Sequence, residues 1–69
     1  MFIRINSKII NLDHCVTIYT WHGVDKHTVE FTMVDGSEES FATVDAQTSN
    51  KMMSGIWEAL ERGDNAITI

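Results

Sequence analysis

The chain has 69 residues with five Lys and Arg against ten Asp and Glu, a formal net charge of −5, one cysteine and no proline. This length fits one domain, and a single cysteine excludes both an internal disulfide framework and a cysteine-rich structural zinc site. The acidic balance disfavours conventional nucleic-acid binding, which needs Lys and Arg to release counterions from phosphates.

The small size of the chain predicts self-association. A domain this short, with neither disulfide nor structural metal, buries barely enough apolar surface to offset the entropy of the ordered chain. Natural domains in this position often oligomerise, so we expect a homo-oligomer, most simply a homodimer. No apolar run is long enough to span a bilayer and no hydrophobic signal region follows Met1, so we expect a cytoplasmic protein without membrane contact.

Alternating and β-branched residues fill the first two-thirds of the chain and predict β-strands. Turn signals such as Asn6-Ser7 and the break at Gly23 separate them. The expected strands comprise residues 2–6, 8–12, 15–22, 27–34 and 40–44. Asp35-Gly36, between the last two of these, predicts a tight hairpin with positive φ at both turn residues.

From Asp45 onward the hydrophobic period changes to that of an amphipathic helix. Asp45 is the expected N-cap, with Thr48 or Ser49 as alternatives, and Gly63 is the expected stop. Gly55, inside the helix, points to close packing on the sheet. The apolar stripe that we expect to face the sheet consists of Met53, Ile56, Trp57 and Leu60.

The last residues, 65–69, alternate again and predict a short terminal strand. Ile67 and Ile69 would form an exposed apolar tail if this segment were free, so we expect it to be ordered at a sheet edge. Addition to the protein's own sheet is the expected arrangement, and exchange onto a second protomer is the alternative.

The order of these elements predicts an α+β fold: an antiparallel β-meander of about five strands, one C-terminal amphipathic helix packed on one face, and a short terminal strand. If Val16 and Ile18 face the helix, other residues must emerge on the far face. These are Cys15, Tyr19 and Trp21, with Phe2 beside them. We interpret this apolar face as an interface; the alternative is a strongly coiled sheet in which both Tyr19 and Trp21 belong to the core.

Few residues are arranged for catalysis or metal binding. His22 and His27 flank a loop that contains Asp25, and such a trio can bind zinc weakly, but surface histidines beside a turn are the simpler interpretation. Cys15 lacks a base on its own side of the strand, because His14 projects to the opposite face, so we interpret it as a small buried hydrophobe. We therefore expect no enzymatic activity, no metal site and no cofactor.

The strand-turn-strand passage at residues 2–13 resembles the second half of a LytTR DNA-binding domain, a family that also has a turn like Asp35-Gly36. That resemblance implies DNA contacts through basic loops, but the corresponding loops here contain Asp25, Glu38 and Glu39, so we expect no direct DNA binding. The order of a small meander and one helix is also similar to FlbD-type flagellar proteins and to short bacterial and phage proteins. The residues that carry this second resemblance are Ile10, Asn11, Leu12, Val16, Ile18, Asp35 and Gly36.

Two functions from different classes follow. The first is a non-enzymatic protein-protein interaction module that self-associates through an apolar sheet face or an open strand edge, since no proline protects an edge. Its expected interface residues are Phe2, Tyr19, Trp21, Ile67 and Ile69. The second is an acidic inhibitor of phage or mobile-element origin, similar to anti-CRISPR proteins, whose carboxylates take the place of phosphates on a nucleic-acid-binding partner. Its candidate residues are Asp25, Asp35, Glu38, Glu39, Glu58, Glu61 and Asp64.

Overall fold

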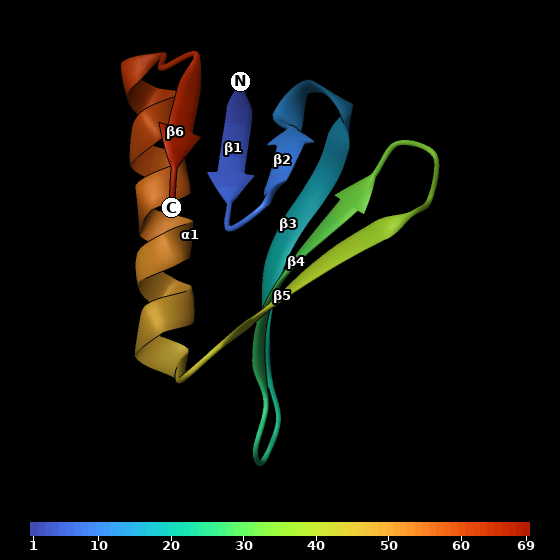
Figure 1. Ribbon diagram of the computed structural model, residues 1–69, viewed down its shortest axis with the longest axis vertical. Coiled ribbons are helices and arrows are strands. Elements are labelled where there is room, and N and C mark those ends of the chain that lie inside the picture. Colours follow the sequence, from blue (N-terminus) through green and yellow to red (C-terminus); the bar gives the residue numbers. More distant parts are fainter.

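The computed structural model describes residues 1–69 and contains six strands and one helix in the chain order expected from the sequence (Figure 1). The elements are β1 (Phe2–Ile5), β2 (Lys8–Asn11), the 3-10 turn η1 (Leu12–His14), β3 (Cys15–His22), β4 (His27–Met33), β5 (Glu38–Thr43), α1 (Ala46–Arg62) and β6 (Ala66–Thr68). The α+β class, the antiparallel strands and the C-terminal helix packed on a sheet are confirmed.

The strands divide into two three-stranded sheets. In the first sheet β1 lies between β2 and β6, antiparallel to β2 and parallel to β6. In the second sheet β4 lies between β3 and β5 and is antiparallel to both. The terminal strand therefore adds to the protein's own sheet, as predicted, with Ile67 in register with Ile3.

One hydrophobic core draws residues from both sheets and from the helix. Its buried members are Ile3, Ile5, Ile10, Val29, Phe31, Phe41 and Ile56. The rings of Phe31 and Phe41 meet edge to face with centroids 5.7 Å apart, a favoured geometry for aromatic pairs. The helix contributes through the side that carries Ile56 and Ala59, which packs on β3, β4 and β5.

Both ends of α1 form as the sequence predicts. Asp45 accepts a hydrogen bond from the Thr48 N–H at 2.7 Å, and this bonding from Thr48 is the main reason that the pKa of Asp45 lies below its ordinary value. Gly63 ends the helix with φ 75°, and its N–H donates to the carbonyls of Ala59 and Leu60. No helix in the structure combines the length and the apolar character needed to cross a membrane.

The loop between β4 and β5 differs from the predicted turn. Only Gly36 has positive φ, at 88°, whereas Asp35 does not. The Gly36 N–H donates to the Met33 carbonyl at 3.0 Å and the Met33 N–H donates to the Ser37 carbonyl at 2.8 Å. These bonds define a three-residue hairpin loop that ends in a left-handed glycine, so one residue more than expected is needed to reverse the chain.

The role predicted for Gly55 is also wrong. A Cβ built on Gly55 would meet no atom within 4 Å, because this position on α1 faces open space rather than the sheet. The helix therefore approaches the sheet without needing a glycine at its contact side.

Candidate interaction surface

β3 is an edge strand of the second sheet, so its outer side has no neighbouring strand. Its eight residues include no proline and no Lys, Arg, Asp or Glu. Natural proteins protect open edges with charges, prolines or covering elements, because unpaired backbone groups recruit other strands. β3 is a long edge that lacks the first two of these protections.

The pairing of β3 with β4 indicates which backbone groups face outward. The Gly23 N–H donates to the Lys26 carbonyl at 2.7 Å, which makes these two a hydrogen-bonded pair at the closed end of the hairpin. Hydrogen-bonded pairs alternate along an antiparallel ladder, so the odd-numbered residues of 17–21 bond to β4. The backbone N–H and C=O groups of Ile18 and Thr20 consequently point away from the sheet, toward a strand that could be added.

A β-bulge at the start of β3 changes which side chains face the helix. The pairing with β4 slips between Cys15 and Thr17, which leaves Val16 as the extra residue. Cys15 and Ile18 both pack against the core, whereas Val16 is exposed. The predictions that Val16 faces the helix and that Cys15 faces the opposite side are therefore wrong, because strict alternation does not hold across a bulge.

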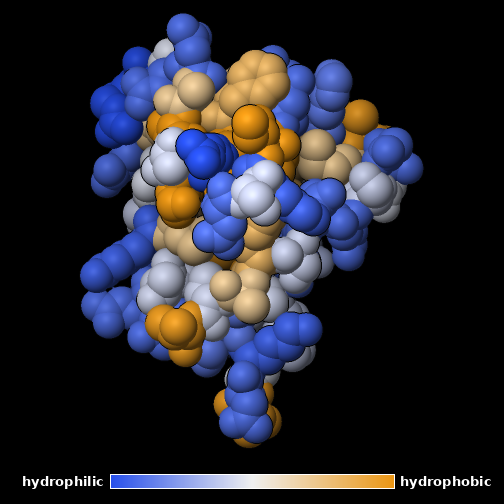
Figure 2. Space-filling model, viewed as in Figure 1, coloured by the Kyte–Doolittle hydropathy of each residue, from blue (hydrophilic) through white to orange (hydrophobic).

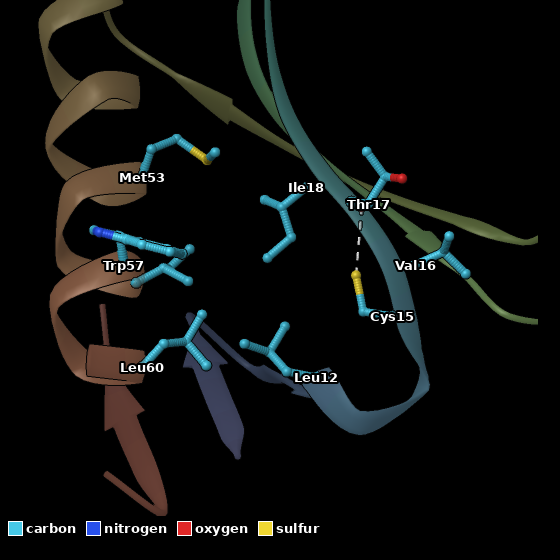
Figure 3. A pocket seen from close by; sticks show the side chains of 9 residues that line it. Leu12, Cys15, Val16, Thr17, Ile18, Met53, Trp57 and Leu60 are labelled. Carbon is cyan, nitrogen blue, oxygen red and sulfur yellow. Dashed lines mark hydrogen bonds between the residues drawn. The ribbon is translucent and has the colours of Figure 1, made fainter. Parts of the chain in front are cut away.

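An apolar groove of about 330 Å³ separates α1 from β3. In Figure 3, Met53, Trp57 and Leu60 project from the helix toward Ile18 on β3 and toward Leu12. The nine residues that line the groove are Leu12, Cys15, Val16, Thr17, Ile18, Met53, Ile56, Trp57 and Leu60, of which only Thr17 is polar. This opening lies at the edge strand, so an added strand would pass across it.

All four residues of the predicted helix stripe line this groove, and two of them are open to solvent. Trp57 is 64% exposed and Leu60 is 45% exposed, whereas Ile56 is buried. The prediction that the whole stripe is covered is wrong because β3 is the last strand of its sheet, and no element beyond it covers these two side chains. Large apolar side chains left open beside a groove are typical of binding surfaces.

Tyr19 and Trp21 lie on the far face of the second sheet, and both are partly exposed rather than in the core. Polar groups share this face: Glu30 Oε1 accepts hydrogen bonds from the hydroxyls of Thr28 and Ser40 at 2.9 and 2.8 Å. Desolvation, together with the nearby carboxylates of Glu38 and Glu30, raises the pKa of Tyr19 above its ordinary value. The aromatic residues thus form a strip along the edge strand instead of a wholly apolar face.

The other three predicted interface residues lie in or beside the first sheet. Phe2 is half-exposed in β1, away from the sheet that carries Tyr19 and Trp21. Ile67 packs against the core of its own chain, and the Ile69 N–H donates to the Arg4 carbonyl at 2.9 Å beyond the end of β6. The five predicted residues are therefore divided between two sheets.

The seven carboxylates of the acidic hypothesis occupy three separate parts of the molecule (Figure 1). The groups are Asp25 in the β3–β4 loop, Asp35, Glu38 and Glu39 at the β4–β5 hairpin, and Glu58, Glu61 and Asp64 at the end of α1. Two of them have cationic partners, because Glu39 contacts Lys8 at 2.8 Å and Asp64 contacts Arg62 at 2.9 Å. The structure does not assemble these residues into one acidic row.

The cysteine and histidine side chains considered for catalysis or metal binding make few contacts with one another. Cys15 is a free thiol whose Sγ donates to the Thr17 carbonyl at 3.4 Å. No group of three or more His, Cys, Asp and Glu side chains converges to hold a metal ion. His22 and His27 do meet, with their Nδ1 atoms 2.9 Å apart, without the participation of Asp25 that the sequence allowed.

Sequence reasoning missed several exposed apolar residues, of which Val24 is the most exposed. Val24, in the loop between β3 and β4, is 97% exposed. Figure 2 shows hydrophobic surface at the lower tip of the molecule, where this hairpin ends. The available signal was a valine between Gly23 and Asp25, in a loop with no apolar neighbour of its own.

No family model, curated protein or solved structure matches this chain. The resemblances to LytTR domains and FlbD-type proteins stay predictions, and the function proposed next rests on the geometry of β3, its groove and its hairpin.

Proposed function

We propose that this protein is a non-enzymatic protein-interaction module that forms a homodimer by pairing β3 with β3 of a second copy. The observation that carries the proposal is the long, uncharged and open edge of β3. A strand added to such an edge gains affinity from main-chain hydrogen bonds and specificity from side-chain pockets. β3 offers outward backbone groups for the first and the adjacent groove for the second.

Two-fold symmetry and the outward groups of Ile18 and Thr20 define the register. A symmetric pairing of one strand with its own copy is antiparallel, because both copies use the same surface. With Thr20 on the two-fold axis, Thr20 pairs with its counterpart and Ile18 pairs with His22 of the second copy. This register leaves the bulge at Val16 outside the ladder, where it does not interrupt the added hydrogen bonds.

The same register brings the aromatic side chains together on the far face. Tyr19 of each copy lies opposite Trp21 of the other, so the dimer has two aromatic cross-strand pairs. These are non-hydrogen-bonded pairs, the kind in which side chains of antiparallel strands approach most closely. Each aromatic pair adds about 0.5–1.5 kcal/mol beyond the burial of its area.

The register also supplies an occupant for the groove. Beyond His22, the hairpin tip of the second copy continues alongside residues 15–17, which line the groove. Its exposed Val24 then lies opposite Val16, at the groove that Trp57 and Leu60 also line, and the apolar surfaces brought together there lose contact with water. A second copy fits this edge because the uncharged strand places no like charges opposite one another.

Disulfide trapping tests this register directly. Thr20→Cys, in a Cys15→Ser background, should give a covalent dimer on mild oxidation, because hydrogen-bonded antiparallel partners lie about 5.5 Å apart between Cα atoms, within disulfide range. Ala42→Cys in the same background is the matched control, since Ala42 is exposed on the opposite edge strand, β5. Equal trapping of both variants would contradict the proposed register.

The oligomeric state tests the dimer itself. Analytical ultracentrifugation of the unmodified chain should show a concentration-dependent dimer. A monomer at tens of micromolar would overturn the proposal.

The lining of the groove supports a binding role rather than catalysis, because one polar residue, Thr17, offers no acid-base pair. The free thiol of Cys15 suits a reducing compartment, which supports the proposal of a cytoplasmic location. The dispersed carboxylates give no comparable support to the acidic inhibitor.

A further inference from the structure

The hairpin between β3 and β4 joins two imidazoles by a direct hydrogen bond. The Nδ1 atoms of His22 and His27 are 2.9 Å apart. The ring planes are tilted by 52° with centroids 5.1 Å apart, so the rings meet through these nitrogen atoms rather than by stacking. Such a bond needs one Nδ1–H as donor and one bare Nδ1 as acceptor. The bond therefore exists only while one of the two rings carries no proton on Nδ1.

The backbone holds the two rings in this arrangement. They are the last pair in the register of β3 and β4, and by the alternation of the ladder they are a non-hydrogen-bonded pair, so their side chains start from closely spaced backbones. The Gly23 N–H donates to the Lys26 carbonyl at 2.7 Å, which closes the hairpin immediately beyond the pair. The ring of Trp21 packs over Gly23 so closely that a Cβ at Gly23 would lie 2.5 Å from it. The imidazole bond is thus part of a closely packed hairpin tip.

The charges around the pair indicate which ring donates. The charged groups are Asp25 and Lys26 in the joining loop, and Asp45 and Lys51 at the start of α1. Asp45 lies near enough to His27 for their charges to interact. The neighbouring part of β5 adds no charge, because the uncharged Thr43 lies opposite His27. A positive charge is therefore better compensated on His27, so His27 is the donor and His22 the acceptor.

We infer that this pair is a pH-sensitive switch in the hairpin tip, in which the imidazole bond forms at neutral pH and breaks when His22 also takes up a proton. Histidine is the side chain whose charge changes between about pH 5 and 8. A first proton gives a His27 imidazolium that still donates to the bare Nδ1 of His22, so the bond persists with charge assistance. A second proton, taken from solvent by the Nδ1 of His22, leaves two positively charged donors facing each other, and the bond is lost.

The switch acts on the proposed dimer, and this part of the inference rests on that proposal. With Thr20 on the two-fold axis, His22 lies opposite Ile18 of the second copy. Both side chains are on the face of β3 that borders the groove, because Ile18 lines the groove and His22 follows it at an even spacing. Apolar surroundings disfavour a charged imidazole. Acid therefore weakens the association of the two copies.

A scalar coupling between the two Nδ1 atoms across the hydrogen bond tests the switch itself. In the chain labelled with a nitrogen isotope, the coupling should be present at about pH 7.5 and lost at about pH 5. His22→Gln should lack it at both values. The two atoms belong to one chain, so the coupling reports on the switch in monomer and dimer alike. Its absence at neutral pH or its persistence in acid would overturn the inference.

Sedimentation velocity at the same two pH values tests the effect on association. The dimer of the unmodified chain should weaken at least about tenfold in acid, because it contains two copies of His22 and each group that must lose a proton contributes up to about tenfold per pH unit. His22→Gln should abolish this loss, whereas His14→Gln, outside the added ladder, should retain it. An equal change in the unmodified chain and in His22→Gln would overturn the effect on the dimer. A monomer at both pH values would overturn the dimer itself, and the coupling alone would then decide whether the switch exists.

Discussion

The two edge strands of the second sheet differ in whether charged side chains protect their unpaired backbone groups. β5 carries Glu38 and Glu39, and Glu39 pairs at 2.8 Å with Lys8 of the other sheet, whose ammonium lies 6.0 Å from the centre of the Phe41 ring. β3 carries no such charge and opens onto an apolar groove. A chain selected only against aggregation would protect both edges. The contrast therefore supports the proposal that the β3 edge pairs with a second copy.

A substitution at the tip of the β3–β4 hairpin should have the largest effect on the affinity of the proposed dimer. Val24→Lys should weaken the dimer about 100-fold, because a symmetric interface loses two buried valines at roughly 1.5 kcal/mol each. Sedimentation velocity over a concentration series measures the dissociation constant. Val44→Lys is the matched control, since Val44 is 88% exposed and Val24 is 97% exposed. Equal weakening by both variants would mean that added charge alone opposes association.

A substitution in the aromatic strip formed by Tyr19 and Trp21 should have the second-largest effect on dimer affinity. Trp21→Ala should weaken the dimer about tenfold or more, because it removes both Tyr19–Trp21 pairs at about 0.5–1.5 kcal/mol each. Trp21→Phe should restore most of the affinity, since it keeps an aromatic ring opposite Tyr19. If Trp21→Ala dimerises like the unmodified chain, the two-fold axis does not pass through Thr20.

A substitution in the helix distinguishes two ways to form a dimer, namely pairing of strand edges and exchange of elements between copies. Gly55→Ala should raise the free energy of unfolding by about 0.5–1 kcal/mol, because the Cβ enters open space in a helix interior. Thermal melting measures this gain, and the dimer dissociation constant should stay the same. Gly63→Ala should have the opposite effect on stability, because the position has φ 75°. A dimer that weakens as Gly55→Ala stabilises the fold would indicate exchange through partial unfolding.

Neutralising the protected edge tests the other half of the comparison. The double substitution Glu38→Thr and Glu39→Thr should allow β5 to pair weakly, which gives species larger than a dimer at high concentration. Static light scattering detects them. Lys8→Met is the control, because loss of the exposed ion pair alone changes stability by at most about 1 kcal/mol. A double variant that stays dimeric would show that charge is not what closes this edge.

The smallest effect concerns the turn that leads into β5. Hydrogen bonds from the Ser37 hydroxyl and N–H lower the pKa of Asp35. A folded pKa below the unfolded one means that this stabilisation is present above about pH 4 and is lost as the pH falls through the folded pKa. Hydrogen-exchange protection in the β4–β5 loop should therefore decrease in acid. Ser37→Ala should begin with lower protection and lose less of it; an equal decrease in both chains would contradict the assignment.

Local sequence chemistry predicts most of the elements but little of the surface. Asp45 and Gly63 mark the helix because capping depends on neighbouring backbone groups alone. The sheets divide where β2 and β3 do not pair, and the first sheet is completed by the pairing of β1 with β6, between residues far apart in the chain, which no local pattern records. The sequence pattern does not predict the bulge at Val16 either, because valine suits either face of a strand. The groove follows from where α1 meets β3, and the exposure of Trp57 follows from that contact.

The parallel pairing of β1 with β6 has a consequence for how the protein is made. β1 is synthesised before β6, yet Phe2 pairs with Ala66 and Arg4 pairs with Thr68. During translation, the edge of β1 that pairs with β6 stays unpaired until all the intervening residues have left the ribosome. Closure between distant segments is slow, and unpaired strands exposed meanwhile are prone to aggregate. The three residues of β6 therefore determine when the nascent chain stops presenting an open strand at its beginning.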